Sequence, residues 1–342
     1  MSKMPMFASI EAVLYPVVCR INEYLSNYIL VFLLIGVGLW YTVRTGFVQI
    51  RFFGEGMRKV FGNLSLNGGK QSSGMTSFQA LATAIAAQVG TGNIVGASGA
   101  ILTGGPGAIF WMWVIAFFGM ATIYAEATLA IKTRRVDKDG TTFQTAFGVP
   151  SQFVGVVLVI FCGFIFLGGV NRLAAVTEKV VPVMAVIFLV GAVGILVVRI
   201  QDVPATFALI FKYAFQPQAI IGGSFGYAIK TAISQGAKRG LFSNEAGMGS
   251  TPHAHAQANV KDPHDQGVVA MVGVFIDTFI VLTLNALVII CTLYTDGGML
   301  ADGVIPEGVN KTNLAQLAFG SVLGDSVGSA FVAVCLFFFA FS

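Results

Sequence analysis

Residues 76–107 read TSFQALATAIAAQVGTGNIVGASGAILTGGPG and carry no charged side chain. The stretch is long enough to cross a bilayer, since a spanning helix needs roughly 20 residues. Its middle, Gly90-Thr-Gly-Asn93, is poor helix-forming sequence, because each glycine costs about 1 kcal/mol relative to alanine in a helix interior. A membrane helix that breaks halfway frees backbone groups that lipid cannot satisfy, so the break must face a buried cavity. We therefore predict a discontinuous helix that forms part of a midplane site for a small charged solute.

The composition supports a membrane location. Of the 342 residues, 56% are hydrophobic and 11% are charged, whereas soluble domains carry about 25% charged residues. The net charge of +4 comes from basic residues at the edges of apolar runs, so it does not indicate a nucleic-acid partner. The four cysteines are far apart and lack metal-ligand spacing, which favours free thiols. The sequence therefore predicts an integral membrane protein.

The N-terminal residues 1–27 form a separate segment in this interpretation. Apolar residues recur there at helical spacing, and Pro16 weakens the helix. The segment lacks the apolar core and cleavage site of a signal peptide. We expect it to lie in the membrane interface, and a frayed terminus is the alternative. A single transmembrane domain is expected over residues 28–342.

Charge bias gives an orientation for the first spans. A span at about 28–43 is followed by a strongly basic loop, which the positive-inside rule places in the cytoplasm with the N-terminus outside. The glycine-broken stretch then runs outward, Gly104-Gly-Pro-Gly107 forms an external turn, and residues 108–131 return.

The same rule predicts a missing helix. Only one apolar run, 151–170, precedes the next basic loop, although two crossings are needed to place that loop inside. We therefore expect that one membrane helix is absent between Asp139 and Thr141. Residues 180–198 and 267–292 are predicted spans, 203–260 one irregular crossing, and 296–325 an acidic loop. The last apolar run, 326–342, stops within a span, so we expect a truncated chain of about eight spans.

A second irregular stretch occupies residues 236–258. It is too polar for a lipid-facing helix, and glycines and Pro252 interrupt it. Glycine- or proline-interrupted spans in two halves of a chain are a sequence signal for a transporter site. Half-helix N-termini offer NH groups to a carboxylate, and unwound carbonyls offer oxygens to Na⁺. The two stretches together favour a site for an amino acid and a sodium ion.

The sequence resembles the alanine or glycine:cation symporter family, which comprises sodium-coupled amino-acid carriers of bacteria and archaea. The resemblance covers about residues 28–342 and is carried by Gly90-Thr-Gly-Asn93, Gly104-Gly-Pro-Gly-Ala108, Phe110-Trp-Met-Trp113, Gly119-Met-Ala-Thr122, Tyr124-Ala-Glu126, Arg239-Gly-Leu-Phe-Ser-Asn-Glu-Ala-Gly247, Ala254-His-Ala256 and Gly273-Val-Phe-Ile-Asp-Thr278. It implies an all-α polytopic membrane protein with the LeuT-type fold, which has two inverted five-helix repeats and discontinuous helices. Family members carry a further helix near residue 140 and about two helices beyond residue 342, so the fold here is expected to be incomplete.

The resemblance also implies roles for individual residues. Backbone NH groups in the first break would bind the substrate carboxylate, and the second break would line the opposite wall. The implied substrate-binding residues are Thr91, Gly92, Asn93, Ser243, Asn244 and Gly247. The implied sodium ligands are Ala86, Val89, Asn93 and Ser342.

Other interpretations of these residues are weaker. Gly90-x-Gly92-x-x-x-Gly96 could suggest a dinucleotide-binding loop, but an apolar helix replaces the required β-strand. Simple helix packing by small residues is the more serious alternative. The three histidines lack the partners of a metal site, so no metal other than Na⁺ is expected. Glu126, Glu245 and Asp277 are ionisable groups in or near spans, with structural pairing as the alternative to a functional role.

We therefore expect a secondary symporter in a bacterial or archaeal cell membrane. It would import alanine or glycine with Na⁺ by alternating access, and the glycine-rich wall favours a small side chain. A proton could replace Na⁺. The expected partners are the amino acid and the lipid bilayer, and no enzymatic activity, cofactor or nucleic-acid partner is expected. The competing hypothesis is a transport-incompetent fragment or a passive pore of the same family.

Overall fold

The computed structural model describes residues 5–62, 77–136, 142–143, 186–216, 225–295 and 297–341. Most of these residues are helical, as expected. The strands within them are β1 (Arg135–Val136) and β2 (Thr142–Phe143), which pair antiparallel with Arg135 opposite Phe143. This short pair of strands departs from the all-α prediction but leaves the helical class unchanged.

In the first half of the chain, short π-helical and α-helical elements alternate with longer helices. In chain order the elements are α1 (Pro5–Tyr24), η1 (Leu25–Ile29), α2 (Leu30–Arg44), α3 (Val48–Arg51), α4 (Phe53–Phe61), α5 (Ser77–Gln88), η2 (Gly92–Gly96), α6 (Ala97–Gly104) and α7 (Ala108–Thr133).

The second half begins with a helix over Val186–Val198. The elements that follow are α10 (Val203–Phe215), α11 (Phe225–Asn244), α12 (Pro252–His255), α13 (Pro263–Val274), η3 (Phe275–Leu282), α14 (Thr283–Leu293), α15 (Leu314–Leu323) and α16 (Asp325–Phe341).

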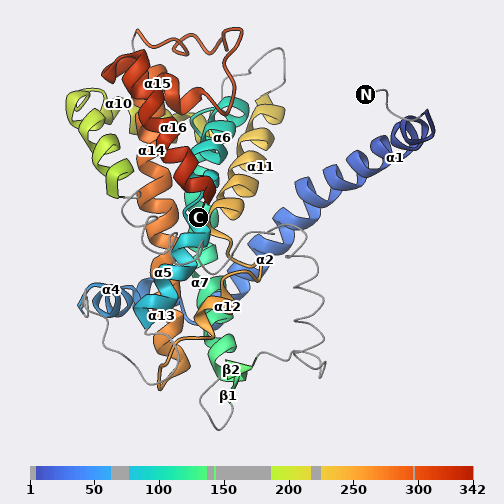
Figure 1. Ribbon diagram of the computed structural model, residues 1–342, viewed down its shortest axis with the longest axis vertical. Helices are drawn as coiled ribbons and strands as arrows, with labels where there is room; N and C mark the ends of the chain where they lie inside the picture. Colours follow the sequence, from blue (N-terminus) through green and yellow to red (C-terminus); the bar gives the residue numbers. More distant parts are fainter. Residues whose placement is uncertain are drawn as a thin grey trace.

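The N-terminal helix projects away from the rest of the molecule. Figure 1 shows α1 extending from the bundle, and η1 joins it to α2 without a break. Pro16 lies inside α1 and does not end it. Tyr15 is 66% exposed and Phe32 is 72% exposed, so this long helix presents apolar side chains outward. Such a surface suits lipid contact, and the interfacial position of residues 1–27 stays a prediction.

Helix α7 lies at the centre of the packing and contacts α2, α11 and α13. Close approach to α11 depends on Gly236 and Gly240, which are four residues apart on one helix face. A Cβ atom on Gly236 would lie 2.5 Å from the Ala108 carbonyl oxygen, and one on Gly240 would lie 3.2 Å from the Met112 Cα. Small residues at this spacing let two membrane helices pack backbone to backbone.

Two continuous helices in the described part of the chain have the length and apolarity to cross a membrane. They are α7, with 26 residues, and the run Pro263–Leu293 through α13, η3 and α14, with 31 residues. The helix Val186–Val198 and α10 could form a third as a broken pair, and they meet at 102°. The predicted spans 108–131 and 267–292 are therefore helical as expected. The molecule is a polytopic membrane protein.

Three other predicted segments can be compared with the structure. The irregular crossing expected over 203–260 contains α10, α11 and α12. The loop expected over 296–325 was partly wrong, because the apolar residues 314–323 form α15. The turn at Gly104-Gly-Pro-Gly107 is confirmed and joins α6 to α7, with Gly105 at a φ of 72°. The predicted span 151–170 lies outside the described residues.

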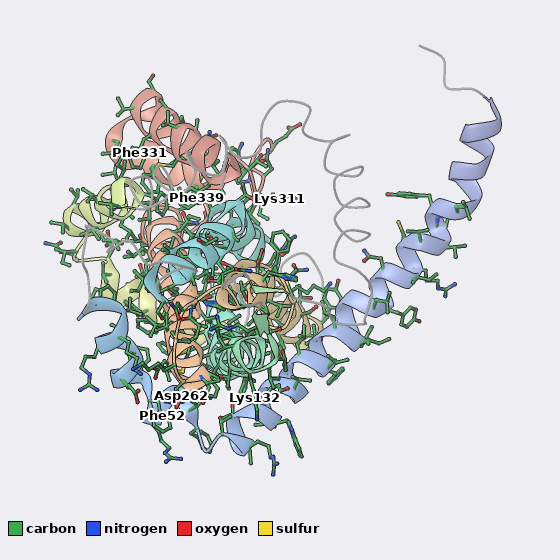
Figure 2. All side chains as sticks on the ribbon, turned by 60° about the horizontal axis from the view of Figure 1, so that its bottom comes forward. Phe52, Lys132, Asp262, Lys311, Phe331 and Phe339 are labelled. Carbon is green, nitrogen blue, oxygen red and sulfur yellow. The ribbon has the colours of Figure 1, made fainter. Side chains whose placement is uncertain are left out.

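A polar network fixes α4 to the start of α13. Lys59 forms ion pairs with Asp265 and, at 3.0 Å, with Glu55, while His264 lies 3.7 Å from Glu55. The hydrogen bond from Lys59 lowers the pKa of the Glu55 carboxyl. Phe52 packs edge-on against His264. Figure 2 shows Phe52 beside Asp262 at this end of the molecule, whereas Phe331 and Phe339 lie at the opposite end. Several linked charges contribute more than an isolated surface pair.

The close contact of α7 and α11 predicts the effect of one added methyl group. Gly236→Ala should lower the melting temperature of the purified protein, because overpacking a tight contact costs about 1–3 kcal/mol. Gly194→Ala is the matched control, since Gly194 is also helical and its added Cβ would meet no atom within 4 Å. An equal melting temperature for both variants, measured by intrinsic fluorescence in detergent, would contradict this packing.

Candidate functional site

The first predicted interruption is present. Helix α5 ends at Gln88, and η2 begins at Gly92. The Gly90 NH donates to the Gln88 carbonyl (2.9 Å) and to Asn93 Oδ1 (3.0 Å). In a continuous α-helix this NH would bond to the carbonyl of Ala86. The break therefore frees the Ala86 carbonyl from its helical hydrogen bond.

The second predicted interruption is also present. Helix α11 ends at Asn244, and α12 begins only at Pro252. Between them Glu245, Gly247 and Gly249 have left-handed backbones, with φ of 54°, 87° and 80°. Glycine adopts this conformation without strain. Two of these three left-handed positions therefore carry the residue that suits them best.

The two interruptions meet inside the molecule. A Cβ atom on Gly92 would lie 3.3 Å from the Cα of Ser243, so the backbone of η2 packs directly on the end of α11. Figure 1 shows α6, which continues η2, beside α11. Asn93, Ser243 and Asn244 are all fully buried. The segments thus form two sides of one buried polar cluster.

A third element, η3, supplies the centre of this cluster. Asp277 on η3 is 0% exposed. Its Oδ1 accepts a hydrogen bond from Asn93 Nδ2 at 2.7 Å, and its Oδ2 accepts bonds from Ser243 Oγ at 3.0 Å and Thr278 Oγ1 at 2.9 Å. All three donors are neutral side chains, and none of the ion pairs among the described residues includes Asp277. Within the part of the chain that the structure describes, this carboxylate thus links both breaks without a cationic partner.

Further amides surround the cluster. Gln88 Nε2 donates to the Asn244 carbonyl at 2.9 Å, and Asn285 Nδ2 donates to the Asn93 carbonyl at 3.0 Å. Within the described part of the chain, the buried Gln88 Oε1 and Asn285 Oδ1 have no hydrogen-bond donor. An unsatisfied buried acceptor costs roughly 1–3 kcal/mol. These oxygens are therefore candidates for binding a cation or the ammonium group of a substrate.

The donor set determines which ion this cluster suits. Carboxylate, hydroxyl and amide oxygens are hard ligands that favour hard cations. The described residues contain no group of three histidine, cysteine or acidic side chains of the kind that holds a multivalent metal. A single buried carboxylate is stabilised when one positive charge neutralises it. The arrangement therefore fits a monovalent cation.

The structure places the predicted site residues in different surroundings. Gly92, Asn93, Ser243 and Asn244 lie together in the cluster, and Val89 is buried at the break. Thr91 has an exposed side chain. Gly247 lies beyond the cluster, where its NH bonds to Glu126.

For two predicted sodium ligands, Ala86 and Ser342, the structure describes a backbone position or nothing at all. The backbone of Ala86 lies in the last turn of α5, and its side chain lies outside the described ones. Ser342 also lies outside the described residues. Their roles as ligands stay predictions.

Sequence reasoning left Asp277 out of the predicted ligand set. Its position in the middle of a long apolar helix was the available signal, because an ionisable residue there is functional by default. Thr278, Gln88 and Asn285 gave no comparable signal, since neutral polar side chains are common in helix packing.

The family model described as the sodium:alanine symporter family matches residues 11–144 and 141–342. An uncharacterized transporter of Haemophilus influenzae is 37% identical over 95% of the chain and 78% of its own length. The sodium/alanine symporter AgcS of Methanococcus maripaludis is 36% identical over 94% of the chain and 79% of its own length. A sodium/proton-dependent alanine carrier protein of Bacillus sp. PS3 is 35% identical over 80% of the chain and 71% of its own length.

The alignments also contain an internal gap. The match to the Haemophilus influenzae transporter extends over 371 residues, more than the 342 residues of the chain, so that relative has internal residues without a counterpart here. The two parts of the family match meet at residues 141–144. This is the position at which the distribution of charge predicts a missing helix.

Proposed function

Because the chain belongs to the sodium:alanine symporter family, we propose that it imports a small neutral amino acid, alanine or glycine, together with Na⁺. The family consists of cation-coupled amino-acid symporters and not of enzymes. We infer that the two breaks are the discontinuous helices of a LeuT-type inverted-repeat fold, with the N-terminus outside the cell. Transport then proceeds by alternating access around them.

One observation carries this proposal, namely the hydrogen bonding of Asp277 to both breaks. The carboxylate bonds to Asn93 of the first break and to Ser243 at the end of the helix before the second. Neutralising this charge with Na⁺ changes the electrostatic energy of both segments at once, because charge interactions are strong in a buried site. Cation binding is thereby linked to the geometry of the amino-acid site.

The amino acid is placed by the backbone of the first break. Thr91 and Gly92 stand at the start of η2, where free NH groups and the helix dipole favour a carboxylate. Gly92 packs closely on the Ser243 backbone, and such packing favours a substrate with a small side chain. The Ala86 and Val89 carbonyls and Asn93 Oδ1 supply oxygens to Na⁺, Asp277 supplies the negative charge, and Ser342 completes the ligand set.

The competing function is a passive pore or a chain that does not transport. It is favoured by the internal residues that the relatives have and this chain lacks. A missing helix would open one wall of the site. The two functions differ in whether solute accumulates against its gradient.

Proteoliposomes with an inward Na⁺ gradient should accumulate labelled alanine above its external concentration, and unlabelled glycine should compete. Replacing Na⁺ by K⁺ at fixed pH should abolish accumulation, because the driving ion is then absent. Uptake that only equilibrates would identify a pore, and no uptake above empty vesicles would identify an inactive chain. Equal uptake with and without Na⁺ under a proton gradient would assign the coupling to H⁺.

Asp277→Asn removes the buried charge and keeps the size of the side chain. The Na⁺ concentration for half-maximal uptake should rise at least about tenfold. Removing a side chain that supports a metal site typically lowers the metal affinity by about this factor. Asp302→Asn makes the same change on an exposed loop and should leave uptake unchanged. A wild-type Na⁺ dependence in Asp277→Asn would contradict the role given to this carboxylate.

A further inference from the structure

Glu126 on α7 contacts the second break outside the Asp277 cluster. Its Oε2 accepts a hydrogen bond from the Gly247 NH at 3.2 Å, and the Gly249 backbone also bonds to this carboxylate. Glu126 is thus bound to the chain that immediately follows the predicted site residues Ser243 and Asn244. Hydrogen bonds to a charged acceptor are stronger than those between neutral groups.

The segment between α11 and α12 needs such an anchor. It has three left-handed residues, Glu245, Gly247 and Gly249, so the helical hydrogen bonds of α11 end with the bond from the Glu245 NH to the Leu241 carbonyl at 2.9 Å. The Met248 NH bonds to the Glu245 carbonyl at 3.0 Å, and the Glu245 side chain accepts a bond from Ser250. Glu126 supplies a hydrogen bond that fastens this turn to another helix.

The segment between α11 and α12 packs closely against the face of α7 that carries Glu126. Gly119, Thr122 and Glu126 are spaced at i, i+3 and i+7, so they share one face of the helix. A Cβ on Gly119 would lie 3.1 Å from that of Ala246, and a Cβ on Gly247 would lie 3.5 Å from Thr122 Cγ2. The segment therefore lies along α7 from Ala246 to the Glu126 carboxylate.

This anchored segment is coupled to the site. The Ala246 NH donates to Asn244 Oδ1 at 3.1 Å, and the same oxygen would lie 3.7 Å from a Cβ on Gly119. Asn244 in turn donates to Thr278 Oγ1 at 3.4 Å, and Thr278 bonds to Asp277. A continuous set of contacts thus runs from Glu126 to the buried carboxylate.

We propose that Glu126 is a positioning residue for transport, whose carboxylate holds the second break on α7 and so fixes Ser243 and Asn244 against Asp277. The effect of Glu126 on transport rests on the proposed function of the Asp277 cluster. The effect of Glu126 on the position of the segment does not rest on that function. The anchoring of the segment and the effect on transport can therefore be tested separately.

The first experiment measures opening of the segment without transport. In a chain whose four native cysteines are replaced by alanine, Thr251→Cys introduces a thiol at a position that is 2% exposed. Glu126→Gln should increase the rate of maleimide labelling in detergent at least about tenfold, because the neutral amide binds the two NH groups more weakly. Glu307→Gln, the same change on an exposed loop, should leave the rate unchanged.

An unchanged labelling rate in Glu126→Gln would overturn the proposal. Should this variant not yield folded protein, Glu126→Asp takes its place, since it keeps the charge but withdraws the carboxylate by one methylene group. Faster labelling is expected there too, and an unchanged rate again overturns the anchor.

The second experiment measures uptake kinetics in proteoliposomes. Glu126→Gln should raise KM for alanine about tenfold at an unchanged amount of folded protein, and its effect should not add to that of Ser243→Ala, because coupled residues are non-additive. Full additivity would overturn the positioning role. If the wild type shows no uptake, the proposed function fails, while the labelling result still decides whether Glu126 anchors the segment.

Discussion

A buried carboxylate that has no cationic partner among the described residues is the constraint on which the site depends. Asp277 is fully enclosed and takes its hydrogen bonds from Asn93, Ser243 and Thr278. A bare charge in such a position is costly, and neutral donors compensate it only in part. The three donors come from different elements, so the energy of this charge depends on how the two breaks and η3 lie relative to one another. Adding a cation changes that balance, which is what a coupled carrier requires.

Glycine makes this arrangement possible in two ways. Gly90 and Gly92 allow the first helix to break, and the missing side chain of Gly92 lets its backbone reach Ser243. Gly236 and Gly240 bring α11 into close contact with α7, so the end of α11 is held in place by backbone packing. The same central helix carries Glu126, which holds the segment beyond α11. The site is thus positioned largely by close helix contacts and backbone hydrogen bonds.

Much of this could be predicted from the sequence. Both interruptions, the turn at Gly104-Gly-Pro-Gly107 and the span over 267–292 follow from glycine placement and apolar run length, which are local properties. The contacts of Asp277 with Ser243 and Asn93 could not be predicted, since these two partners are 34 and 184 residues away in sequence. Helix α15 was missed because a ten-residue apolar run within an acidic stretch is ambiguous. The continuity of α1 with α2 was hidden by Pro16, whose local penalty the helix tolerates.

The central claim is that one cation binds at the Asp277 carboxylate and joins the two broken segments. The most direct measurement is the melting temperature of the purified protein as Na⁺ replaces choline at constant ionic strength, since a ligand that binds only the folded state stabilises it. The account predicts a saturable rise in the wild-type protein and none in Asp277→Asn. An equal rise in both proteins, or no rise in either, would contradict it.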